Sequence, residues 1–137
     1  MKKIYLFLAA ISCVCAALVL NSCTDVHMQA AYGIGIHEMK ASGDDFLYFC
    51  EYLREKGVPF EGDEGVQIFE GKSQKDCDAK AAAFFNEQAA KLSHEEVKEF
   101  LDYPNDFYVE YSIVASKKNP NDETRVLGAW IYPKPVE

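Results

Sequence analysis

The sequence is poor in basic residues relative to acidic ones. Its 137 residues include 14 lysines and arginines against 22 aspartates and glutamates, which gives a net charge of −8. A chain with this balance is repelled by nucleic-acid phosphates and by anionic lipid headgroups. We therefore expect no nucleic-acid partner and no attachment to a membrane through charge.

The sequence also lacks the short motifs that identify common enzymes. It contains no glycine-rich phosphate loop, no dinucleotide fingerprint, no serine-hydrolase elbow and no paired zinc motif. The acidic pair Asp44 and Asp45 falls in an expected first helical turn, where carboxylates stabilise the helix dipole. These absences favour a protein that binds a partner over an enzyme, and they predict no catalytic residues and no cofactor.

Candidate metal ligands are few and poorly spaced. His27 and His37 lie ten residues apart, which is about 33 Å along one strand and too far to share an ion. The acidic residues Glu61, Asp63 and Glu64 lack the alternating ligands of an EF-hand loop. We therefore predict no metal site.

A long apolar run occupies the start of the chain. Lys2 and Lys3 precede an uncharged apolar stretch at residues 4–20, and the stretch closes in Leu20-Asn21-Ser22-Cys23. This order of a basic start, an apolar centre and small or polar residues at a cleavage point is typical of a targeting segment.

The segment resembles the signal peptide of bacterial lipoproteins, in the form common in Bacteroidota. The resemblance implies that residues 1–22 are removed and that Cys23 becomes the lipidated first residue, held to a membrane of the cell envelope. Thr24, in place of the aspartate that retains some lipoproteins at the inner membrane, favours the outer membrane. An uncleaved anchor and an ordinary secretory signal are the alternatives.

Removal of residues 1–22 changes both the charge and the cysteine count. The mature chain keeps 12 basic and 22 acidic residues, a net charge of −10. Of the five cysteines, only Cys50 and Cys77 remain once Cys23 is lipidated. Outside the cytoplasm such a pair can form a disulfide. The alternative is that both are small buried hydrophobic residues on helices.

Residue periodicity predicts a single domain at residues 30–137 after a tether at residues 23–29. Ser42, Ser73 and Ser93 each precede a helical pattern as N-cap candidates. The expected helices are residues 43–56, 74–92 and 94–102, and the expected strands are residues 26–39, 66–70, 107–115 and 125–132. The expected fold is α+β with two layers: helices on one face of a mixed four-stranded sheet, in the order β-α-β-α(α)-β-β.

The face of this sheet away from the helices is the candidate binding surface. If Phe107 and Leu127 point inward, alternation places four aromatic or polar side chains outward: His37, Tyr108, Trp130 and Tyr132. Such rings suit a contact with a sugar or a protein because they bury much area. The alternative is that Trp130 covers a strand glycine.

These observations predict a small lipid-anchored envelope protein that binds an unidentified protein or glycan. A second hypothesis is an inhibitor or immunity-type protein of a secreted enzyme. In that case the acidic loop at residues 61–64 and the turn at residues 119–122 would reach into the enzyme.

Overall fold

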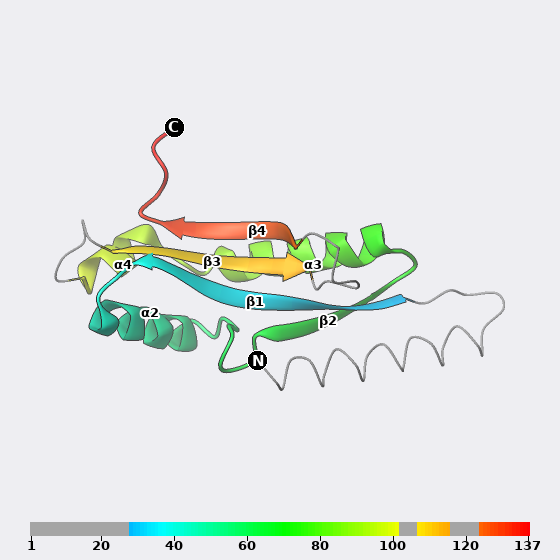
Figure 1. Cartoon of the computed structure of the whole chain (residues 1–137), viewed down its shortest axis with the longest axis horizontal. Helices are drawn as coiled ribbons and strands as arrows, with labels where there is room; N and C mark the ends of the chain where they lie inside the picture. Colours follow the sequence, from blue (N-terminus) through cyan, green and yellow to red (C-terminus); the bar gives the residue numbers. More distant parts are fainter. Residues whose placement is uncertain (1–27, 102–106, 116–123) are drawn as a thin grey trace.

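The computed structural model describes residues 28–101, 107–115 and 124–137 (Figure 1). Cys23, the predicted signal peptide and the turn at residues 119–122 lie outside the described residues. The described elements are β1 (Met28–Lys40), α2 (Gly43–Glu55), β2 (Val66–Gly71), α3 (Gln74–Ala89), α4 (His94–Glu99), β3 (Tyr108–Ala115) and β4 (Arg125–Tyr132). The α+β class and the order of elements are as predicted. Within these ranges no helix combines the length and apolar character needed to cross a membrane.

The strands form one sheet in the order β2-β1-β3-β4, and every neighbouring pair is antiparallel. The expectation of a mixed sheet is therefore wrong. The antiparallel direction of β2 follows from the loop at residues 57–65. The backbone N–H of Ile34 in β1 donates to the carbonyl of Gly65 at 2.6 Å, and the carbonyl of Ile34 accepts from the N–H of Glu61 at 2.8 Å. The loop thus reaches the middle of β1 before β2 begins, so β2 runs back along the N-terminal half of β1.

Each described helix begins at a predicted serine. The Oγ of Ser42, Ser73 and Ser93 accepts a hydrogen bond from the backbone N–H three residues later, at 3.2, 3.2 and 3.4 Å. Such caps satisfy N–H groups that have no partner inside the helix. Helix α2 ends before Gly57, whose φ of +66° lies in the left-handed region that favours glycine.

The helices pack on one face of the sheet. Phe49 of α2 stacks on Trp130 at 5.9 Å between ring centroids, and Phe85 of α3 stacks on Tyr111 at 5.2 Å. Tyr111 and Trp130 are cross-strand partners, so their side chains share a face. We call the opposite face, on which none of the described helices packs, the helix-free face.

On the first and third strands, the side chains that alternation places opposite to the outward His37 and Tyr108 form the core. They are at most 1% exposed: Tyr32, Ile34, Val109, Tyr111 and Ile113. The alternation of these two strands therefore predicted their buried side.

The structure does not join Cys50 and Cys77. Cys50 in α2 and Cys77 in α3 are both buried, and no disulfide links them. The Cys77 thiol lies 3.4 Å from the carbonyl oxygen of Met28, and burial raises the pKa of the Cys50 thiol. The disulfide expectation is wrong for this structure, and the alternative of two small buried side chains describes it.

Candidate functional site

The structure corrects the predicted binding face at β4. Trp130 and Tyr132 are only 9% and 5% exposed, and they point toward the helices. Their cross-strand partners are the core residues Tyr111 and Val109, which share their face. The prediction that Trp130 and Tyr132 belong to an exposed binding surface is therefore wrong.

A bulge and a glycine decide which side chains of β4 face the helices. Ile113 pairs with Gly128 whereas Val114 pairs with Val126, so one extra residue lies between them in β4. A Cβ on Gly128 would lie 2.5 Å from Phe85 Cδ1, so only glycine admits that ring beneath the strand. Because β4 carries apolar residues at both odd and even positions, alternation alone could not identify its buried side.

Trp130 is enclosed by the helices. Its ring lies 4.4 Å from the His94 ring as well as 5.9 Å from that of Phe49. Nε2 of His94 lies 2.7 Å from the carbonyl oxygen of Ile131 on the edge strand. Stacked pairs of this kind stabilise a fold by about 0.5–1.5 kcal/mol each, so we assign this cluster to the core.

His37 and Tyr108 do lie on the helix-free face. His37 is exposed and pairs across the strands with Glu110, while Tyr108 is half-buried and pairs with Lys40. The structure thus keeps two of the four predicted residues on this surface, on strands β1 and β3.

Three rows of residues cross the helix-free face from strand to strand. Each row consists of directly opposed partners on neighbouring strands. The valine row is Val66, Gly33, Val114 and Val126; the small-residue row is Gly35, Ser112 and Ala129; the histidine row is His37, Glu110 and Ile131. The first two rows carry no charged side chain.

Ser112 is the one described side chain that is buried without a hydrogen-bond partner. It is 1% exposed, and its Oγ makes no hydrogen bond. A buried hydroxyl without a partner costs about 1–3 kcal/mol.

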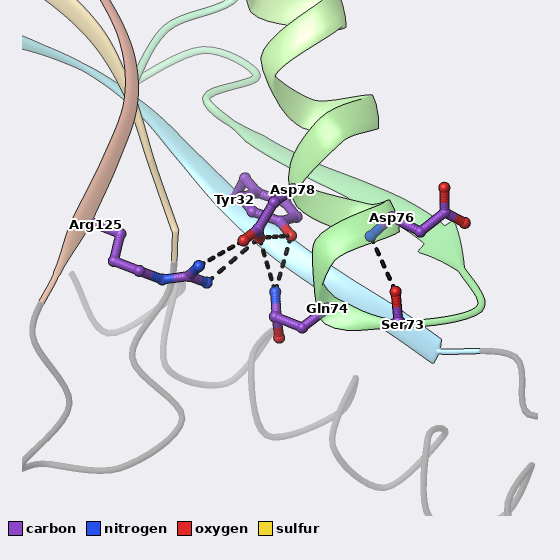
Figure 2. Close-up of polar contacts among 6 residues, drawn as sticks. All are labelled: Tyr32, Ser73, Gln74, Asp76, Asp78 and Arg125. Atoms are coloured by element: carbon purple, nitrogen blue, oxygen red, sulfur yellow. Dashed lines mark hydrogen bonds and ion pairs between the residues drawn. The ribbon is translucent and has the colours of Figure 1, made fainter.

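A second site, on the face of the sheet that the helices cover, is a polar cluster between α3 and the sheet (Figure 2). The Tyr32 hydroxyl donates to Asp78 Oδ1 at 2.6 Å, and Gln74 Nε2 donates to the same oxygen at 2.8 Å. The guanidinium of Arg125 donates to both carboxylate oxygens, at 2.5 and 3.3 Å. The cluster joins α3 to β1 and β4.

The pKa values in this cluster oppose acid–base chemistry at neutral pH. Burial, and then the hydrogen bond to Asp78, raise the pKa of Tyr32 well above its ordinary range. Burial works to raise the pKa of Asp78, but the hydrogen bonds from Tyr32, Gln74 and Arg125 outweigh it and lower that pKa. Tyr32 is thus held as a donor and Asp78 as an acceptor, so the cluster stabilises the packing of α3.

We expect the free energy of unfolding of Asp78→Asn to fall less steeply at acid pH than that of the wild type. Folding lowers the pKa of Asp78, so its carboxylate contributes to the stability of the fold above the unfolded pKa of about 3.9. This contribution is lost as pH falls through the folded pKa. The variant should be less stable by about 1–2 kcal/mol at pH 6, and the difference should shrink toward pH 3. Urea denaturation over this range measures it.

The matched control is Glu87→Gln, which removes one negative charge from an exposed position of the same helix. Its stability difference from the wild type should stay within about 0.5 kcal/mol at every pH. A difference for Asp78→Asn that is constant with pH would contradict the assigned role.

The acidic loop is held against the domain. Nε of Arg54 lies 2.9 Å from Asp63 Oδ2, and the guanidinium lies over the Phe60 ring at 5.2 Å. The backbone N–H of Glu61 donates to β1, as described above. Within the described ranges, no group of three or more histidine, cysteine, aspartate or glutamate side chains is placed to hold a metal ion.

The candidate surface is therefore the helix-free face, and the polar and aromatic clusters are structural. His37 and Tyr108 could be placed on this face from sequence, whereas the three rows depend on pairing between strands far apart in the chain. Comparison with protein-family models, with curated proteins and with solved structures finds no match to this chain.

Proposed function

We propose that this chain is a lipid-anchored lipoprotein of the bacterial cell envelope that acts as a binding module through its helix-free face. The observation that carries the proposal is the composition of that face. When helices cover one side of an antiparallel sheet, the other side is usually polar because it meets water. Here the two adjacent uncharged rows include Val126, which is 58% exposed, and the exposed Ala129. An apolar surface of this kind favours a macromolecular partner.

The proposed anchor would hold this face close to a membrane. Only residues 24–27 separate Cys23 from the start of β1 at Met28, a span of at most about 18 Å. The resemblance at Thr24 favours the outer membrane. Since the mature chain is acidic, acyl chains and not charge would provide the attachment.

A protein partner has more support than a glycan. Sugar rings are bound by exposed aromatic faces, and Trp130 and Tyr132 are buried in the core. The buried centre of a protein–protein contact is apolar and poor in charged residues, as the valine row is. The inhibitor hypothesis has less support, because the acidic loop is bound to β1 and to Arg54.

Photo-crosslinking in intact cells tests the proposal. We expect benzoylphenylalanine at Ala129, on the helix-free face, to give an adduct of higher mass after irradiation. The control is the same residue at Ala83, an exposed alanine on α3, which should give none. Equal adduct formation at both positions, or none at Ala129, would refute the assignment of this face.

A further inference from the structure

The backbone hydrogen bonds of the sheet decide which N–H and C=O groups of β4 point away from it. In an antiparallel sheet both groups of one residue point to the same side, and that side alternates along the strand. Ile34 of β1 uses both of its groups on the loop before β2, so they point away from its β3 partner Ile113. The groups of Ile113 therefore point toward Gly128 of β4. By alternation, Ala129 and Ile131 direct their N–H and C=O groups outward.

The surroundings of β4 agree with this direction. The carbonyl oxygen of Ile131 lies 2.7 Å from Nε2 of His94, as expected for a group that β3 does not use. Strand β4 forms one margin of the sheet (Figure 1). Among the described residues, no backbone hydrogen bond beyond those of the sheet reaches β4. Both outward groups of Ala129 are therefore open to a further strand.

The two edges of the sheet differ in their protection. Edge strands usually carry charged side chains or proline, which keep other strands away. At the β2 edge, Nζ of Lys80 donates to the carbonyl of Glu70 at 2.7 Å, and the exposed Glu70 carboxylate adds a charge. Strand β4 has no charged residue and no proline from Val126 to Tyr132. Its protection is limited to His94 near one end and the bulge near the other.

The side chains beside this edge indicate what an added strand would carry. On the helix-free face the edge is lined by Val126, Ala129 and Ile131, of which Val126 is 58% exposed. A strand paired with β4 would place alternate side chains beside these aliphatic residues. Charged side chains there would lose hydration without gaining a partner. The edge therefore fits an extended segment that is apolar on this face.

A second copy of this chain fits the edge less well than a different protein. The chain carries a net charge of −8, so two copies repel each other. Pairing of two β4 strands would bring these acidic chains together through a narrow contact that has no charge to offset the repulsion.

We propose that a different protein adds an extended, apolar segment to the outer edge of β4, as a fifth strand of the sheet. The inference rests on the proposed function, because the added segment would border the helix-free face. The outward N–H and C=O groups of Ala129 would bond the backbone of the segment, and Val126 and Ile131 would favour apolar side chains on it. Strand addition of this kind obtains affinity from the main chain and specificity from alternate side chains.

Proline substitution on the edge tests this arrangement in intact cells. Ala129→Pro removes the outward N–H and places a ring where the added strand would lie, and edge strands tolerate proline at such positions. With benzoylphenylalanine at Val126 as the photo-crosslinker, we expect this substitution to lower the yield of adduct roughly tenfold. Ala129→Ser keeps the N–H and should retain the yield of the wild type.

The matched control is Ile68→Pro on β2. Ile68 is 42% exposed, and alternation from Ile34 directs its N–H away from β1. This variant should fold and should leave the adduct at Val126 unchanged. If Ala129→Pro does not fold, Ile131→Pro takes its place, because it removes the other outward N–H.

Hydrogen exchange of the purified wild-type chain tests the open edge without a substitution. The N–H of Ala129 points outward, whereas the N–H of Trp130 points toward β3. We expect the Ala129 amide to exchange roughly tenfold faster or more. Equal protection of the two amides would overturn the proposal.

The outcomes of the crosslinking experiment are distinct. Loss of the adduct in Ala129→Pro, with its retention in Ala129→Ser and Ile68→Pro, supports the proposal. An adduct that persists in the folded proline variant overturns the added strand but leaves the helix-free face as a contact surface. An adduct of twice the mass of the chain identifies a second copy and overturns a different protein as the partner. Absence of an adduct at Val126 overturns the added strand, and if Ala129 also gives none, the proposed surface is overturned with it.

Discussion

Phe49→Ala is expected to lower the free energy of unfolding by about 3–5 kcal/mol. The Phe49 side chain is 0% exposed, and its ring centroid lies 5.9 Å from that of Trp130 and 6.1 Å from that of Phe107. Truncation would open a cavity between α2 and two strands that cannot collapse without moving the helix. Urea denaturation followed by the fluorescence of Trp130, the single tryptophan, measures the change.

The neighbouring residue Tyr48 provides the control. It lies on the same helix but is 49% exposed, so Tyr48→Ala should change stability by no more than about 0.5 kcal/mol. If Phe49→Ala and Tyr48→Ala had the same effect, α2 would not be packed on the sheet through Phe49.

Cys23→Ser is expected to abolish acylation of the protein and, with it, the removal of residues 1–22. On the proposed lipidation, two or three acyl chains hold the mature chain, and each buried methylene contributes about 0.8 kcal/mol. The wild type should take up labelled palmitate and have the length of residues 23–137, whereas the variant should take up none and keep the apolar run at residues 4–20. Autoradiography and immunoblots of labelled cells measure the two properties.

Cys13→Ser is the matched control, because it changes a cysteine in the segment that would be removed. This variant should be acylated and shortened like the wild type. Incorporation of palmitate by Cys23→Ser, at the level of Cys13→Ser, would show that acylation does not use the Cys23 thiol.

Local signals in the sequence predicted most of the fold. The capping serines and the apolar spacing gave the position of every described helix, and alternation gave the buried side of β1 and β3. These signals act within one turn or one strand, so a single segment contains all the information they need.

The errors concern contacts between distant segments. The buried side of β4 depends on the bulge opposite Ile113 and on the fit of Phe85 over Gly128. The direction of β2 depends on two backbone hydrogen bonds at Ile34. The contacts that decide the buried side of β4 and the direction of β2 leave no periodic signal in the sequence.

The polar cluster shows the same limit. Gln74 and Asp78 are four residues apart, a spacing that brings side chains together on a helix. Their partners Tyr32 and Arg125 come from strands 42 and 47 residues away. Only the packed fold identifies Asp78 as the acceptor shared by all three.

The most direct test of the account is the intact mass of the natural protein, extracted from its own membranes with detergent. The account predicts a chain that begins at Cys23 and carries the added mass of a diacylglyceryl group, with or without a further acyl chain. A chain that begins at Met1, or at another residue without acyl mass, would contradict it.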